Sequence, residues 1–99
     1  ENASGISVIY KHSPRCVVSM MAYRRLKSEF PNFNQLEIPV YIVDVVNNRT
    51  ESQSIANQFN IRHESPQLLV IKEGQCIYNA SHEDVSFEPL STLAGASAE

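Results

Sequence analysis

Residues 6–19 read ISVIYKHSPRCVVS, and they combine a strand pattern, a turn and the start of a helix. The apolar and largely β-branched run Ile6–Tyr10 predicts a strand. Cys16 follows a short polar segment and opens a helical pattern that continues to about Phe30. At a strand-to-helix turn, unsatisfied backbone N–H groups and the helix field favour a thiolate over a thiol. Cys16 therefore has the position of a nucleophile.

A proline stands directly before a second apolar run, in residues 59–75, which read FNIRHESPQLLVIKEGQ. The segment resembles the thioredoxin superfamily pattern, in which an Ile-Arg segment leads to a cis proline, an apolar strand and a Lys-x-Gly turn. The resemblance implies that Pro66 is cis and lies beside Cys16. It also implies that Ser65 presents its backbone N–H and C=O to an extended substrate segment, as in β-augmentation.

Length and composition predict an ordinary soluble domain spanning residues 1–99. The chain is 42% apolar and 19% charged, and no apolar run approaches the roughly 20 residues that span a bilayer. Its formal net charge of −3 argues against binding to a nucleic-acid backbone. We therefore expect no membrane and no nucleic-acid partner. The first residue is Glu1 and not an initiator methionine. Removal of a leader segment before Glu1 is therefore an alternative that stays open.

The order of patterns predicts an α/β protein with the thioredoxin-like fold, a four-stranded mixed sheet with helices on both faces. The first helix is expected to bury Val18, Ala22, Leu26 and Phe30 and to end at Pro31-Asn32. The continuous run 40–45 predicts a strand buried on both faces. The predicted elements are strand 6–10, helix 16–30, strand 40–45, helix 48–59 capped by Asn48, strands 67–72 and 75–80 around Glu73-Gly74, and a short helix after Ser86.

The residues around Cys16 predict a site with a single thiol. Position 19 is serine, so the motif is CVVS and dithiol exchange within the site is excluded. The Ser19 hydroxyl is expected to donate to the thiolate, and Arg15 adds positive charge from the turn. Cys76 lies at the far end of a hairpin, roughly 20 Å from Cys16 at about 3.3 Å per residue, so no disulfide between them is expected.

The strings VIYKHSPRCVVS and NASHEDVS, with the proline segment, narrow the resemblance to the monothiol bacilliredoxin family. The family resemblance implies a cytoplasmic reductase that removes a low-molecular-weight thiol, bacillithiol or similar, from mixed disulfides on proteins. It implies Cys16 as nucleophile, Ser19 in place of a resolving cysteine and Pro66 as the cis proline, with no tightly bound cofactor. Val17 departs from the family, which commonly carries proline at this position.

Two other functions stay open from the residues alone. One is a binding module in which Cys16 lies in a groove for a partner peptide without reacting. The other is a carrier of a metal or an iron-sulfur cluster, which needs converging ligands, usually four. The only candidate metal ligands expected near the Cys16 turn are His12, His63 and Cys16, and their spacing matches no metal motif. We therefore expect both histidines to be rim residues and no metal site.

Overall fold

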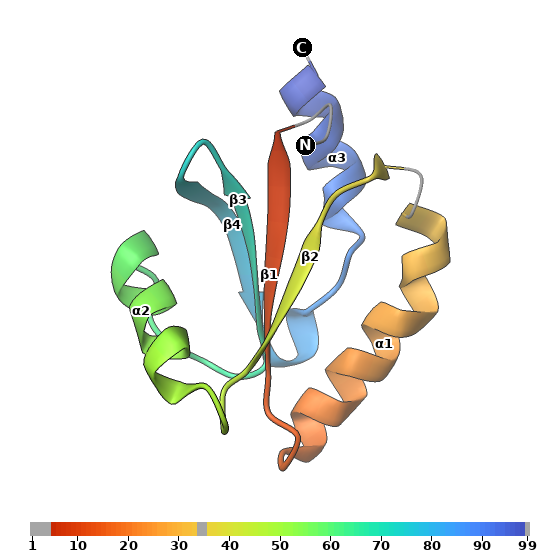
Figure 1. Cartoon of the computed structure of the whole chain (residues 1–99). Helices are drawn as coiled ribbons and strands as arrows, with labels where there is room; N and C mark the ends of the chain where they lie inside the picture. The colour runs from red at the N-terminus through yellow and green to blue at the C-terminus, as the bar shows by residue number, and fades with distance from the viewer. Residues whose placement is uncertain (1–4, 34–35, 99) are drawn as a thin grey trace.

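The computed structural model describes residues 5–33 and 36–98, with side chains described as far as Leu93. Four strands form one sheet in the order β2-β1-β3-β4 (Figure 1). β1 pairs parallel with β2 and antiparallel with β3, and β3 pairs antiparallel with β4. The predicted mixed sheet is thus confirmed. The strands are β1 (Ile6–His12), β2 (Val40–Asp44), β3 (Gln67–Lys72) and β4 (Gln75–Ser81).

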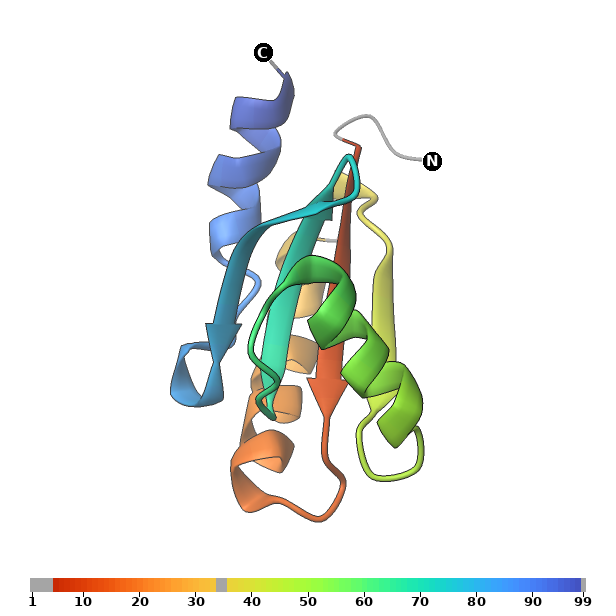
Figure 2. The same ribbon diagram turned by 90° about the vertical axis from the view of Figure 1, so that its left-hand side faces the viewer.

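Helices cover both faces of the sheet. α1 (Val17–Phe33) and α3 (Pro89–Ala98) lie on one face and α2 (Arg49–Phe59) lies on the other, as Figures 1 and 2 show from two directions. A short 3-10 turn, η2 (His82–Asp84), joins β4 to the segment before α3. We call the end of the sheet where β1 and β2 finish and α1 and α2 begin the Cys16 end. No helix in residues 5–33 and 36–98 is both long and apolar enough to cross a membrane.

Alternation along β1 sends neighbouring side chains to opposite faces of the sheet. Ile6, Val8 and Tyr10 enter the core under α1, whereas Lys11 lies under α2 and is 0% exposed. Each fully buried apolar side chain contributes about 1.5–3 kcal/mol of transfer free energy, so this cluster stabilises the attachment of α1 to the sheet. The buried members of the cluster are Ile6, Val8, Tyr10, Ala22, Leu26, Leu68, Val70, Val85, Phe87 and Leu90.

The third predicted element is a strand, but the prediction that it is buried on both faces is wrong. β2 is an edge strand, and its Tyr41 and Ile42 side chains are 58% and 56% exposed. Continuous apolar runs are typical of central strands, yet here β1 and β3 occupy the centre. Val43 is the one β2 side chain that is buried.

The first helix differs from its prediction in length and in its buried face. α1 continues through Pro31 to Phe33, because the fixed φ of proline is compatible with a helix. Proline has no N–H, so the helix loses one backbone hydrogen bond near its end. Its buried residues are Ser19, Ala22 and Leu26. Val18 and Phe30, expected in the core, are 37% and 45% exposed because the helix is rotated so that Ser19 faces the sheet.

The caps and turns follow the sequence in part. Asn60 ends α2 in the left-handed conformation with φ 56°, as predicted, and the Glu73-Gly74 turn has positive φ at both residues. Asn48 is the N-cap of α2 but makes no side-chain capping hydrogen bond. The Asp44 carboxylate instead accepts from the backbone N–H groups of Val46 and Asn47 and orders the turn before α2.

Candidate active site

Cys16 lies in the turn between β1 and α1 and is the residue directly before the helix. Its N–H donates to the Ser13 carbonyl at 3.2 Å, which closes the turn. Its carbonyl accepts from Met20 N–H at 3.0 Å, which is the first bond of the helix. The thiol is half-buried. The side chain therefore stands over the free N–H groups of the first helical turn, as the sequence predicts.

Hydrogen bonds lower the pKa of the Cys16 thiol below its ordinary value. The strongest cause is the backbone N–H of Ser19, and the Val18 N–H and the Ser19 hydroxyl act in the same direction. Partial burial opposes them. These groups stabilise the charged form because they donate to sulfur, which favours a thiolate at the start of α1.

Ser19 connects this turn to the sheet below it. The residue is 0% exposed. Its Oγ accepts from Ser13 N–H at 3.3 Å, so the hydroxyl proton remains available for the Cys16 sulfur. Its carbonyl accepts from the Tyr10 hydroxyl at 3.1 Å. Hydrogen bonds from Tyr10 of β1 and from Ser13 of the turn thus fix the position of Ser19 beside the thiol.

Tyr10 and His12 support the first turn of α1 from β1. Tyr10 has one hydroxyl proton, which it donates to Ser19, so the 3.2 Å contact with His12 Nδ1 places a proton on that nitrogen. Burial, assisted by the negative charges of Tyr23 and Cys16, raises the pKa of Tyr10 to about 12. The hydroxyl therefore stays protonated and keeps its donor role at neutral pH.

The proline segment reaches the same turn. The Ser65–Pro66 peptide bond is cis. Ser65 Oγ lies 3.4 Å from Ser19 Oγ, so the loop before β3 and the helix that carries Cys16 meet at these two hydroxyls. The Pro66 carbonyl accepts from His82 N–H at 2.9 Å. The structure therefore brings Ser65 and Pro66 to the Cys16 end of the sheet, although both residues are far from Cys16 in the sequence.

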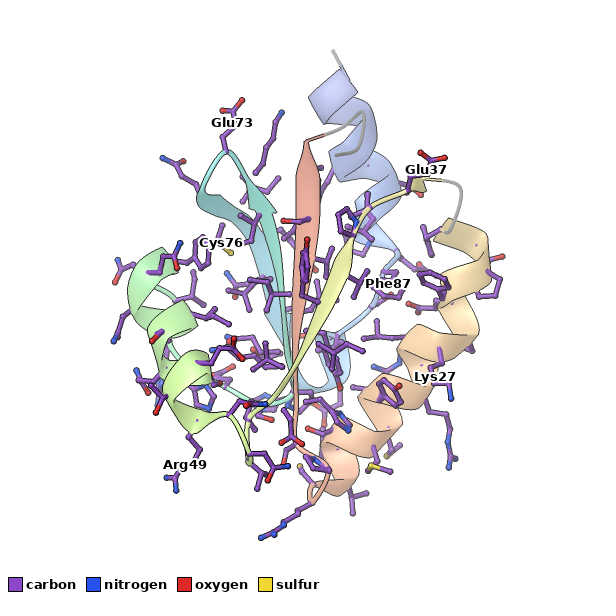
Figure 3. All side chains as sticks on the ribbon, in the orientation of Figure 1. Lys27, Glu37, Arg49, Glu73, Cys76 and Phe87 are labelled. Carbon is purple, nitrogen blue, oxygen red and sulfur yellow. The ribbon has the colours of Figure 1, made fainter. Side chains whose placement is uncertain are left out.

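Arg15 and Cys76 stand apart from this arrangement. Arg15 is exposed in the turn, and the groups that lower the pKa of Cys16 are the hydrogen-bond donors of Ser19 and Val18. Cys76 lies on β4 (Figure 3), where its thiol donates to the Tyr78 carbonyl at 3.2 Å. Burial raises the pKa of Cys76. Both cysteines are free, as predicted.

The two histidines near the Cys16 end lie on different faces of the sheet. The His12 ring packs against Tyr23 of α1, with a centroid separation of 4.9 Å. His63 contacts Lys11 and Ser52 on the α2 face. Within the described residues, no group of three or more His, Cys, Asp or Glu side chains is placed to hold a metal ion.

Sequence reasoning missed two supports of the site and one contact on the α2 face of the sheet. Tyr10 stands six positions before Cys16 on the α1-facing side of β1, and a buried phenol normally finds an acceptor, which is the signal that could have identified it. Ser13 supplies a backbone N–H, which has no sequence signature. The contact of Lys11 with His63 joins residues far apart in the chain and was invisible before the fold was known.

The two thiols are expected to differ in their rates of alkylation. Limited alkylation at neutral pH should label Cys16 before Cys76, because hydrogen bonds lower one pKa and burial raises the other. The Cys16 rate should fall as the pH drops through its folded-state pKa, at a midpoint below that of a free thiol. Peptide mapping after a short iodoacetamide pulse measures both rates. Equal labelling, or faster labelling of Cys76, would contradict this assignment.

Comparison with known proteins agrees with the fold. A family model described as monothiol bacilliredoxin BrxC matches residues 1–90. A solved structure described as a candidate oxidoreductase with a thioredoxin fold is 28% identical, with a TM-score of 0.75 over 90% of this chain and 77% of that chain. Malassezia sympodialis thioredoxin is 20% identical, with a TM-score of 0.67 over 97% of this chain and 77% of its own. Trxlp from Edwardsiella tarda is 19% identical, with a TM-score of 0.66 over 93% and 86%. The last two are similar in fold alone.

Proposed function

Because this chain belongs to the monothiol bacilliredoxin family, we propose that it is a thiol-disulfide oxidoreductase that works through Cys16 alone. The family and the oxidoreductase-like structural neighbour support a redox role. The observation that carries the finer proposal is the set of hydrogen bonds from Ser19 and Val18 to the Cys16 sulfur. It favours a nucleophilic thiolate, while serine at position 19 removes the second thiol that dithiol enzymes use.

The reaction is a transfer of a disulfide bond in two exchanges. The Cys16 thiolate attacks the small-thiol sulfur of a protein mixed disulfide, and a bond between Cys16 and the small thiol forms as the original S–S bond breaks. The protein thiolate leaves and takes a proton from solvent. A second small-thiol thiolate then attacks the bound small thiol, which releases Cys16 and a symmetrical disulfide. Each exchange conserves one disulfide, so no other oxidant is required.

The family suggests bacillithiol as the small thiol and proteins carrying mixed disulfides as partners. Ser65 is our candidate for the backbone contact with the client segment, since the Pro66 carbonyl is already engaged by His82. Val17 and Met20, which are 73% and 50% exposed, offer apolar surface beside Cys16 for client side chains. We place the protein in the cytoplasm, where small thiols keep protein thiols reduced.

Turnover is expected to require added thiol. With a test protein that carries one glutathione mixed disulfide, the chain alone should release at most about one equivalent of test protein, because each Cys16 stops as its own adduct. Added reduced glutathione should restore repeated turnover above the uncatalysed rate. Release of free test-protein thiol against time measures both phases. No release in either condition, with Cys16 intact and accessible to alkylation, would return the chain to the binding-module alternative.

A further inference from the structure

A lysine is buried under α2. Lys11 is 0% exposed and lies on the face of β1 that α2 covers. Among the described residues no carboxylate forms an ion pair with it, and burial lowers its pKa. A buried cation without a counter-charge costs stability, whereas an apolar side chain of similar length would fill the same space without that cost. Stability alone therefore does not account for a lysine at this position.

A second buried polar side chain stands directly beside Lys11. Gln67 of β3 is its cross-strand partner, so the two Cβ atoms are about 4.5–5.5 Å apart on the same face of the sheet. Gln67 is 2% exposed. Its Nε2 donates to the Arg62 carbonyl at 2.9 Å, whereas its Oε1 has no hydrogen-bond partner within the described residues. The amide therefore directs its hydrogen bond to the loop before Pro66.

Both buried side chains hold the same short loop. Residues 61–66, which we call the proline loop, descend beside α2 to the Cys16 end of the sheet, where β3 begins (Figure 2). Lys11 Nζ lies 3.1 Å from His63 Nδ1, and an ammonium group can only donate, so the ring nitrogen accepts. Ser52 Oγ of α2 lies 3.4 Å from the same nitrogen. Two consecutive loop residues, Arg62 and His63, are thus fixed from β3 and from β1.

The proline loop also meets the turn that carries the thiol. Ser65 Oγ lies 3.4 Å from Ser19 Oγ, and the Ser65 backbone is our candidate contact for the client segment. His63 is two residues before Ser65, and two extended residues span at most about 7 Å. Because so few bonds separate them, a shift of His63 moves Ser65 relative to Cys16.

We propose that Lys11 is a positioning residue, which fixes the proline loop so that the Ser65 backbone meets the protein client while Cys16 reacts. Gln67 assists from the neighbouring strand. This inference rests on the proposed function and adds a residue that acts on client binding and not on the thiol. The hydrogen bonds that favour the Cys16 thiolate come from α1, so a change at Lys11 leaves them in place.

Lys11→Met tests the proposal with two substrates. Methionine is of similar length and uncharged, and Ser52 can still donate to His63, so the variant should fold with a Tm at or above that of the native protein. The rate constant of the first exchange at Cys16 is measured with a test protein that carries one glutathione mixed disulfide and with bis(2-hydroxyethyl) disulfide, which has no peptide backbone. The ratio of the first rate constant to the second should fall about tenfold, the size expected for loss of one hydrogen bond from a charged group.

Amide hydrogen exchange measures the position of the loop directly. The amides of residues 61–65 should exchange faster in Lys11→Met, while those of β1 and β3 keep their native rates, because the loop opens locally. The pH midpoint of Cys16 alkylation should stay at its native value. Gln67→Met removes the second bond to the loop and should lower the same ratio about threefold. It decides the question if Lys11→Met does not fold.

Lys72→Met is the matched control, because Lys72 lies at the other end of β3 and its loss removes the same charge. It should leave the ratio unchanged. A ratio that neither Lys11→Met nor Gln67→Met lowers, or an equal loss of both rate constants, would overturn Lys11 as a positioning residue while leaving the native Cys16 reactive. Failure of the native protein to react with either substrate would instead overturn the proposed function itself.

Discussion

Cys16→Ser is expected to abolish both the small-thiol adduct and any reductase activity. The Ser19 and Val18 donors stabilise a thiolate at this position, and a serine hydroxyl at the same place does not ionise near neutral pH or form a disulfide. The adduct should drop from one per chain to none, and release of a test protein should fall to the uncatalysed rate. Intact mass and the release assay measure the two effects.

Cys76→Ser is the matched control for this change. Cys76 is half-buried and its pKa is raised by burial, so its loss should leave the Cys16 adduct and the turnover rate near those of the native protein. Catalysis that survives Cys16→Ser but not Cys76→Ser would show that Cys76, and not Cys16, is the reactive thiol. Circular dichroism of both variants separates lost chemistry from lost folding.

Ser19→Cys is expected to convert the single-thiol site into one that resolves its own adduct. The Ser19 hydroxyl is among the groups that lower the pKa of the Cys16 thiol, so a thiol at position 19 lies on the side of the helix that faces Cys16 and can form a disulfide with it. The introduced thiol attacks Cys16, and the small thiol leaves as a thiolate. The adduct should then disappear without added reductant, and an internal disulfide that lacks two hydrogens should replace it.

Ser19→Ala provides the comparison for this variant. It removes the hydroxyl without supplying a thiol, so the adduct should persist. The pKa of Cys16 should rise relative to the native protein because one donor to the thiolate is lost, while the backbone N–H donors remain. The alkylation midpoint should therefore move to higher pH. A persistent adduct in Ser19→Cys, with no internal disulfide, would contradict the geometry described for the turn.

Local patterns in the sequence were enough to predict the elements that carry the site. The apolar run before Cys16, the hairpin residues Glu73-Gly74 and the left-handed Asn60 each depend on nearby residues, and the structure confirms them. Strand order depends on contacts across the whole chain. The exposed face of β2 was therefore mispredicted, because an apolar run alone does not distinguish a central strand from an edge strand.

The same limit applies to the site. Ser19 lies three residues after Cys16, in the first turn of α1, so the sequence could predict that the two residues interact. The rotation of α1 that buries Ser19 and exposes Val18 depends on packing against the sheet. The contacts from Tyr10 to Ser19 and from Lys11 to His63 arise when β1 meets α1 and the loop before β3. They became visible only with the three-dimensional arrangement.

The intact mass of the native protein after incubation with a small-thiol disulfide, read together with a peptide map, tests the single-thiol mechanism most directly. We expect one adduct per chain, located on Cys16, that persists until reduced thiol is added and then disappears. An adduct found only on Cys76, or an unmodified Cys16 that still reacts readily with iodoacetamide, would contradict the assignment of Cys16 as the redox nucleophile.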